Sequence, residues 1–259
     1  MPLFPVVSYE KNSGKPKLVF IGGFPDNETS SWGKVVPEKL SQDYDLYFLC
    51  LPGYEKGGNI PLWGYNFHQL IEFLDATLGQ KVSQDRYTLV CHDWGAFIGL
   101  LYQTKFPDKV KKLVLLDVGM VTPFTASLKS LLYVSMYQIW FVISFLVSRV
   151  IGAYLGTIFM GIFYLPIFKP LWPSYDRPPV PRREISVNKC YPYLYLWKDL
   201  LSLKFPNITF PICPTLYMFG NQKNCMFHDD EFINTLKNRK DCDVREVNAG
   251  HWLQISKAE

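Results

Sequence analysis

Short apolar runs that alternate with amphipathic stretches are the feature that most limits how this chain can fold. Roughly four to eight apolar residues in a row, each run followed by a helical pattern, indicate strands that are buried on both faces. The pattern therefore predicts an α/β fold with a doubly wound, mostly parallel sheet. The runs are KLVFIGG (17–23), YDLYFLCLPG (44–53), YTLVCHD (87–93), KLVLLDVG (112–119), PTLYMFG (214–220) and DVREVNAGHW (243–252), with helical patterns such as FHQLIEFLDATLGQ (67–80) between them.

Residues 121–205 break this alternation. A long apolar stretch is followed there by the proline-rich LPIFKPLWPSYDRPPVPRRE and the aromatic NKCYPYLYLW. Because clustered prolines interrupt regular elements, we interpret 121–205 as an inserted helical cap on a core formed by 1–120 and 206–259. A chain of 259 residues, 48% hydrophobic and 19% charged, is long enough to bury one large core.

Charge and cysteine content exclude several classes of protein. The formal net charge is only +4, from 27 Lys and Arg against 23 Asp and Glu, so we expect no nucleic-acid partner. The six cysteines show no C-x-x-C spacing, which favours buried, reduced thiols. The first residues lack a basic region followed by an apolar stretch, so we expect a cytoplasmic protein. We expect no metal and no cofactor, and the oligomeric state stays open.

The stretch LVCHDWGAFIG (89–99) carries the strongest chemical signal. It lies where a predicted strand turns into a predicted helix, at the edge of a parallel sheet where active sites form. Cys91, Gly95 and Ala96 are small enough for a tight turn, and the pattern small-x-nucleophile-x-small is typical of a nucleophile elbow. Asp93 occupies the nucleophile position. The alternative is an aspartate that caps the helix outside any active site.

Two further motifs make the resemblance specific. IGGFPDN follows the first long strand, NAGHW follows the last, and the order nucleophile, acid, histidine is that of the α/β-hydrolases. With its H-D-W-G elbow, the chain resembles the epoxide hydrolase and haloalkane dehalogenase branch of that fold. The H-G-x-P motif of the branch matches Gly23, Phe24 and Pro25, but Gly22 stands in place of its histidine. This departure loosens the loop's hydrogen bonding without removing a catalytic group.

The resemblance implies an aspartate chemistry. A carboxylate can displace a leaving group at saturated carbon and form an alkyl ester, so Asp93 implies an epoxide or an alkyl halide as substrate. His251 would activate the water that cleaves the ester. The backbone N–H groups of Phe24 and Trp94 would hold the oxyanion that forms.

The carboxylate that orients His251 has two candidate positions. Many relatives carry an acid in the loop after the strand PTLYMFG, where this chain has the uncharged Asn224. Others place the acid after the strand that precedes the cap, and LVLLDVG offers Asp117 there. We favour Asp117; the alternative is that it only caps a loop. Asp229 and Asp230 read as the N-terminal cap of the helix DEFINTLKN.

Aromatic residues of the predicted cap bear on the substrate. Tyr191 and Tyr137 resemble the two cap tyrosines that protonate the departing oxygen in epoxide hydrolases. Trp140 stands where a tyrosine is often found, and its N–H could instead bind a halide. The sequence thus predicts a hydrolase of lipophilic epoxides. A haloalkane dehalogenase, another α/β-hydrolase of unassigned substrate, and a catalytically inactive membrane-associated binding protein stay open as alternatives.

The apolar stretch 131–168 contains a single charge, Arg149, which separates two runs of about 18 and 19 residues. Such runs are typical either of cap helices or of a hairpin that spans a membrane. A spanning hairpin would have to sit between two halves of one catalytic domain, so we favour a cap with peripheral membrane contact.

Overall fold

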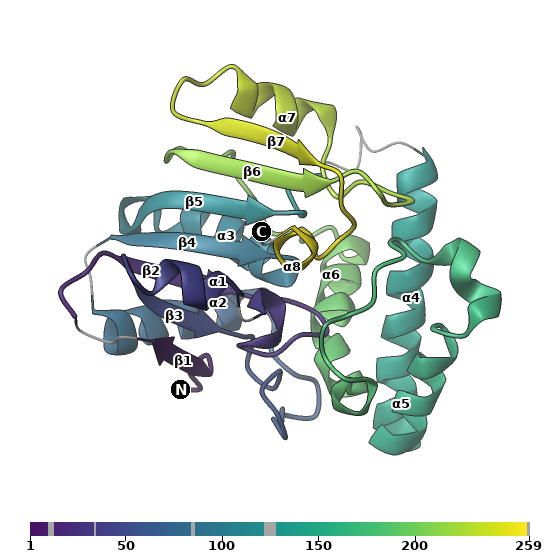
Figure 1. The fold of residues 1–259 in the computed structure, drawn as a ribbon. Helices are drawn as coiled ribbons and strands as arrows, with labels where there is room; N and C mark the ends of the chain where they lie inside the picture. The colour runs from purple at the N-terminus through teal and green to yellow at the C-terminus, as the bar shows by residue number, and fades with distance from the viewer. Residues whose placement is uncertain (10–12, 34, 84–85, 122–127, 258–259) are drawn as a thin grey trace.

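The protein is an α/β structure built on one twisted sheet (Figure 1). The computed structural model describes residues 1–9, 13–33, 35–83, 86–121 and 128–257. In these ranges the sheet has the strand order β1-β3-β2-β4-β5-β6-β7; only β1 and β3 pair antiparallel. The predicted doubly wound, mostly parallel sheet is confirmed. The strands are β1 (Val6–Tyr9), β2 (Lys17–Ile21), β3 (Asp45–Leu49), β4 (Tyr87–His92), β5 (Val110–Leu116), β6 (Thr215–Gly220) and β7 (Asp243–Val247).

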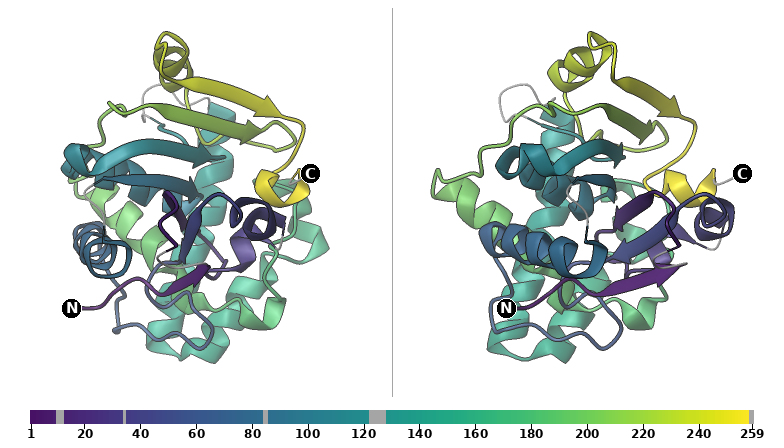
Figure 2. Two further views of the ribbon diagram at one scale, coloured as in Figure 1. Left: turned by 60° about the vertical axis from the view of Figure 1, so that its left-hand side comes forward. Right: turned by 90° about the vertical axis from the view of Figure 1, so that its left-hand side faces the viewer.

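Helices cover both faces of the sheet because its central strands are apolar on both sides. Val19 and Ile21 of β2 belong to the apolar cluster on the side of α2 and α3, whereas Phe20 packs on the other side with Trp32 and Leu253. Figure 2 shows α2 and α3 on one face and α1 and α8 on the other. Successive side chains of a strand point to opposite faces, so a continuous apolar run needs two covers. The core helices are α1 (Val35–Leu40), α2 (Phe67–Thr77), α3 (Trp94–Lys105), α7 (Asp230–Lys237) and α8 (Leu253–Ser256).

The segment between β5 and β6 leaves the sheet and forms a separate helical layer. It contains α4 (Leu128–Val150), α5 (Ala153–Ile162) and α6 (Tyr191–Leu201). In Figure 1 the arrowheads of the parallel strands point toward these helices. The carboxyl ends of the strands, where α/β folds place their chemistry, therefore face the helical layer. The predicted cap boundary at residue 121 adjoins residues 122–127, which lie outside the described residues.

One side of this helical layer is apolar and exposed. Within the described residues one helix, Ser130–Val150, has the length and composition needed to cross a membrane, and 28% of its most apolar window is buried. Its neighbour α5 is shorter and also apolar. The exposed side chains on these two helices are mainly large aliphatic ones: Leu128, Leu131, Leu132, Met136, Ile139, Ile143, Leu146, Val150, Tyr154, Leu155 and Ile158.

Candidate active site

Asp93 lies on a sharp corner between β4 and α3. Its backbone has φ 54° and ψ −125°, a conformation that costs a non-glycine residue on the order of 1–3 kcal/mol. Two glycines make room for this corner. A Cβ on Gly95 would lie 2.0 Å from the carbonyl oxygen of Ile21, and a Cβ on Gly23 would lie 2.2 Å from Oδ1 of Asp93. The strained corner projects the carboxylate toward the helical layer, as the elbow pattern predicts.

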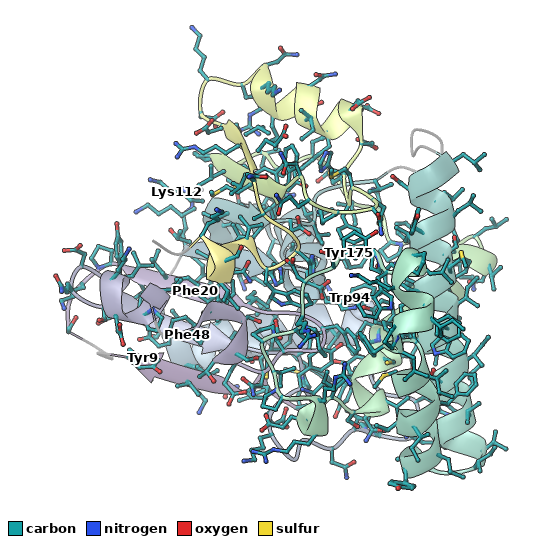
Figure 3. The ribbon with its side chains drawn as sticks, turned by 45° about the vertical axis from the view of Figure 1, so that its right-hand side comes forward. Tyr9, Phe20, Phe48, Trp94, Lys112 and Tyr175 are labelled. Carbon is teal, nitrogen blue, oxygen red and sulfur yellow. The ribbon has the colours of Figure 1, made fainter. Side chains whose placement is uncertain are left out.

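The loop after β2 supplies a hydrogen-bond donor to this carboxylate. The backbone N–H of Phe24 donates to Oδ1 of Asp93 at 2.6 Å. Trp94 is the first residue of α3, so its backbone N–H has no partner in the preceding turn of the helix. The structure thus brings both predicted oxyanion-hole residues beside Asp93. Figure 3 shows Trp94 where the sheet meets the helical layer, with Tyr175 nearby.

Ser31 fills the space beside Gly22, the glycine that replaces the histidine of the H-G-x-P pattern. A Cβ at Gly22 would lie 2.4 Å from Oγ of Ser31, so the space is already taken. The Ser31 hydroxyl donates to Oδ2 of the buried Asp26 at 2.9 Å, and the indole N–H of Trp252 donates to the same oxygen at 2.8 Å. Burial raises the pKa of Asp26 to about 6, against the opposing effect of these two hydrogen bonds. The loop is therefore held through Asp26.

His251 lies on the loop between β7 and α8 and reaches two carboxylates. Its Nε2 is 3.4 Å from Oδ2 of Asp93, and its Nδ1 is 2.5 Å from Oδ2 of Asp117. Burial alone would lower the pKa of His251, but the hydrogen bonds and charges of Asp117 and Asp93 outweigh it and raise that pKa to about 9. The imidazole is therefore a cation at neutral pH when Asp93 is ionised.

The backbone around His251 is held from both sides. Nε2 of His92 lies 3.0 Å from the His251 carbonyl oxygen; because a carbonyl can only accept, His92 carries its proton on Nε2. Burial lowers the pKa of His92 to about 4, so its ring stays neutral. On the opposite side the His251 N–H donates to Oγ of Ser174 at 3.3 Å, and the next N–H, that of Trp252, donates to Oδ2 of Asp176 at 3.1 Å. Both acceptors belong to the loop that follows α5.

Asp117 follows β5 and is completely buried. Its Oδ1 accepts the backbone N–H of Gly220 at 3.1 Å and lies 2.5 Å from Nζ of Lys223, whose side chain is also completely buried. Burial would raise the pKa of Asp117, but Lys223 and His251 together hold it well below its usual range. Asp117 is thus a permanent anion between two cations.

Lys223 was missed by the sequence reasoning. It lies one residue before Asn224, the alternative position for the acid. Because β5 and β6 are parallel neighbours, the residues that follow them meet at one edge of the sheet. A lysine in the loop that follows β6 was the sequence feature that could have indicated a contact with Asp117.

Asn224 does not contact His251. Its side-chain amide donates to the carbonyl of Trp172 at 2.7 Å, and its Oδ1 accepts the hydroxyl of Tyr175 at 3.2 Å. The structure therefore brings Asp117 to the histidine and uses Asn224 to attach the loop after α5 to the core. Asp229 caps α7 by accepting the N–H of Phe232 at 2.8 Å, as expected for that motif.

A cavity of about 760 Å³ separates these groups from the helical layer. Asp93, His251 and Phe24 line it from the core. Tyr137 on α4 and Tyr193 on α6 line it from the opposite side, and both are buried. Its remaining walls are mainly aromatic or aliphatic and include Phe141, Met160, Phe163, Tyr164, Trp172 and Val180.

The hydroxyl groups of Tyr137 and Tyr193 can each donate a proton into the cavity. Tyr137 accepts a hydrogen bond from Nε2 of Gln138 at 3.2 Å, and Gln138 in turn accepts the indole N–H of Trp197 at 3.1 Å. This leaves the Tyr137 proton available. Burial, together with the charge of Asp93, holds the pKa of Tyr137 and that of Tyr193 well above the usual value, so both stay protonated.

Tyr191 and Trp140 do not lie where the sequence analysis expects them. Tyr191 is fully buried outside the cavity lining, and its hydroxyl donates to the carbonyl of Pro52 at 3.2 Å. Trp140 stacks on Phe159, and its indole N–H donates to the Phe159 carbonyl at 3.2 Å, so it is not directed at a ligand. Tyr193, two residues along α6, lines the cavity instead.

Comparison with known proteins gives similar folds with different activities. A family model described as alpha/beta hydrolase fold matches residues 16–141. One similar structure is the epoxide hydrolase of Bacillus megaterium with a bound inhibitor: TM-score 0.68, 19% identity, 98% of this chain and 92% of that chain covered. An epoxide hydrolase from hot-environment metagenomes has TM-score 0.72 at 16% identity, covering 98% and 90%. A marine microorganism esterase has TM-score 0.62 at 13% identity, covering 99% and 95%. Such identities demonstrate the fold alone.

A curated relative matches a shorter segment. The cis-3-alkyl-4-alkyloxetan-2-one decarboxylase of Shewanella oneidensis is 37% identical over 57 residues, which are 22% of this chain and 18% of that protein. The matched segment thus spans about a fifth of the relative.

Proposed function

We propose that this chain, which has the α/β-hydrolase fold, is a hydrolase that opens lipophilic epoxides through an alkyl ester on Asp93. The observation that carries the proposal is the carboxylate at the elbow, 3.4 Å from His251 and facing a cavity whose lining includes the buried Tyr137 and Tyr193. A serine there would attack a carboxyl carbon, whereas a carboxylate attacks saturated carbon.

The first step forms the ester. An oxygen of Asp93 attacks an epoxide carbon, the carbon–oxygen bond of the ring breaks, and the departing oxygen takes a proton from Tyr137 or Tyr193. An alkoxide leaves poorly without a proton, and a positioned acid typically contributes about 10²–10⁴-fold. The raised pKa of both tyrosines supports this role, because each is protonated when the substrate binds.

The second step cleaves the ester. Alkylation removes the charge of Asp93, one of the two carboxylates that raise the pKa of His251, so that pKa falls and the imidazolium gives its proton to the tyrosinate. The neutral imidazole can then accept a proton from water. The resulting hydroxide attacks the ester carbonyl, and the N–H groups of Phe24 and Trp94 hold the oxyanion. The tetrahedral intermediate collapses, its hydroxyl proton passes to the departing alkoxide oxygen, and the diol leaves with Asp93 restored as a carboxylate and His251 again an imidazolium. Asp117 orients the imidazole throughout.

Two other classes of substrate, alkyl halides and strained lactones, could also react with Asp93. A halide needs N–H donors: the indole N–H of Trp140 is bonded to the Phe159 carbonyl, whereas that of Trp94, the residue after Asp93, is buried and has no hydrogen-bond partner among the described residues, so a halide stays a candidate. A strained four-membered lactone ring is the second candidate, supported by the relative whose name specifies an oxetan-2-one. Both belong in the same assay.

The apolar helical layer supports two further parts of the proposal. We propose that residues 121–205 act as a cap over a core formed by 1–120 and 206–259. The exposed aliphatic side chains of α4 and α5 would then rest on a membrane surface, in a protein that is otherwise cytoplasmic. Flotation with lipid vesicles, followed by release in carbonate, tests this contact; resistance to carbonate would contradict a peripheral mode.

A single turnover in heavy-oxygen water tests the chemistry. The probes are a lipophilic epoxide, a terminal bromide, a β-lactone and a carboxyl ester of matched chain length. We expect the epoxide to react fastest. The heavy oxygen of the first turnover should remain on Asp93, because water attacks the ester carbonyl and the first diol carries an old carboxylate oxygen.

Asp93→Asn is the control for this assay. An amide cannot attack saturated carbon, so the variant should fold normally and show no turnover when assayed directly after purification, before slow deamidation restores the carboxylate. Full activity of the fresh variant, or turnover of the carboxyl ester alone, would overturn the aspartate mechanism.

A further inference from the structure

The mouth of the cavity differs in charge from its interior. The interior walls are buried and mainly apolar. Three cationic side chains, Lys169, Arg177 and Arg182, line the same cavity but are exposed, so they lie at its solvent end. They come from separate points of the segment that links α5 to α6.

Three cations at the mouth outnumber the one carboxylate, Asp176, that lines the cavity beside them. Across the described ranges none of them forms a salt bridge, although Lys169 lies over the ring of Tyr175, 5.5 Å from its centroid. Asp176 is the acid among the lining residues nearest to them in sequence, and its Oδ2 accepts the Trp252 N–H. The mouth therefore carries an excess of positive charge that would attract an anion.

The inner end of the cavity offers no such attraction. Its cation, His251, is already paired with Asp93 and Asp117, so an anionic end of a substrate would meet the charge of Asp93 with no free cation to offset it, whereas an uncharged strained ring carries no charge to be repelled. A molecule with an apolar chain and one anionic group therefore has a single favourable orientation, with its anion at the mouth.

Resting on the proposed function, we propose that the substrate is an amphipathic epoxide with an anionic group held by Lys169, Arg177 and Arg182. The apolar chain fills the aromatic interior, and the ring reaches Asp93. The anion is a carboxylate or a phosphate, because both accept hydrogen bonds from Arg and Lys. The charged mouth thus selects the substrate and fixes which end enters first.

The test compares three probes of one chain length: a long-chain epoxy acid, its methyl ester and the corresponding epoxyalkyl phosphate. They are supplied below their micelle concentration and without vesicles. We expect kcat/KM for the acid or the phosphate to exceed that for the ester by roughly tenfold, since exposed ion pairs are individually weak. The anionic probe with the higher kcat/KM shows whether the substrate carries a carboxylate or a phosphate. Raising the salt concentration should shrink the preference.

Charge-removing variants test the assignment of residues. In Lys169→Gln/Arg177→Gln/Arg182→Gln the ratio of anionic probe to ester should fall toward one. Arg183→Gln is the matched control, because Arg183 is exposed beside Arg182 but does not line the cavity, and it should keep the wild-type ratio.

Three outcomes would overturn the proposal. One is equal kcat/KM for ester and anions in the wild type, and another is a ratio that survives in the triple variant. The third is an effect of the triple variant that appears only when the probes are delivered in anionic vesicles, since the cations would then bind a membrane. Failure of the epoxide mechanism is distinguishable, because all three probes would then be inert.

Discussion

The two sides of the cavity are built by different forces. On the core side, Asp93, Asp117, His251 and Lys223 form a charged floor in which contacts of 2.5–3.4 Å between charged groups fix each side chain. On the other side, Tyr137, Phe141, Phe163 and Tyr193 form an aromatic roof whose rings pack with centroids 5.3–6.1 Å apart. Ring packing tolerates a change of shape better than a buried ion pair tolerates loss of a partner.

We infer that the floor determines the reaction, whereas the roof shapes the apolar part of the substrate site. Chemistry at Asp93 needs the reacting atoms held within a fraction of an ångström, and charge-assisted hydrogen bonds supply that geometry. The roof contributes apolar volume and two hydroxyl groups. Substitutions in the two regions should therefore fail in different ways.

The largest expected effect is that of Asp117→Asn. It should slow ester hydrolysis by on the order of 10⁴-fold, because the amide cannot stabilise the imidazolium. Ester formation should suffer less, so mass spectrometry should detect an alkylated Asp93. If Asn224→Ala traps the adduct instead, the acid has been assigned to the wrong residue.

The same substitution leaves Lys223 buried without its carboxylate. We therefore expect Asp117→Asn to lose about 3–5 kcal/mol of unfolding free energy as well. Asp117→Asn/Lys223→Met should regain much of the stability and none of the activity, measured by denaturant unfolding alongside the kinetics. Stability that stays low in the double variant would mean that Lys223 is not the cause.

Tyr193→Phe should have the next largest effect, on the roof. Epoxide opening should slow by about 10²-fold or more, whereas displacement of a bromide, which leaves without a proton, should change little. Tyr191→Phe is the matched control on the same helix. It loses only the hydrogen bond to Pro52, worth about 1 kcal/mol of stability, and its kinetics should match the wild type. Reversed effects of the two variants would restore Tyr191 as the proton donor.

The floor should also make the stability of the protein depend on pH. The pKa of His251 in the folded protein, about 9, exceeds the ordinary histidine value of 6.5, so the stability that its charge provides is complete below pH 6.5 and is lost as pH rises through 9. Relative to His251→Gln, the wild type should lose roughly 3 kcal/mol across that window in denaturant unfolding. Parallel stability curves for the two proteins would show that Asp117 and Asp93 do not raise this pKa.

The sheet was predictable from sequence, and so were the positions of the elbow and the histidine loop. Buried parallel strands produce apolar runs of a length that few other structures share. The corner at Asp93 needs small residues at fixed offsets, and Gly95 satisfies a steric requirement that can be recognised without coordinates. These features are local, so a short stretch of sequence contains the information.

The roof was less predictable because helix faces depend on distant contacts. Tyr191, Tyr193 and Tyr195 recur every second residue on α6, so they point in different directions, and only packing against the core decides which one faces the cavity. Trp140 lies on a helix that is apolar over most of its surface, so the spacing of apolar residues does not show which face of the helix turns toward the cavity. Lys223 and Asp117 meet only because β5 and β6 are neighbours in the sheet.

The loop after α5 is attached to the same backbone that carries His251. Ser174 and Asp176 accept the N–H groups of His251 and Trp252, and Asn224 donates to the carbonyl of Trp172. Lifting this edge of the helical layer would break these bonds and release the histidine loop. Opening at this edge and catalysis could then not occur at the same moment. His251 would be in position only while the edge is closed, so an ester on Asp93 would be hydrolysed only after closure.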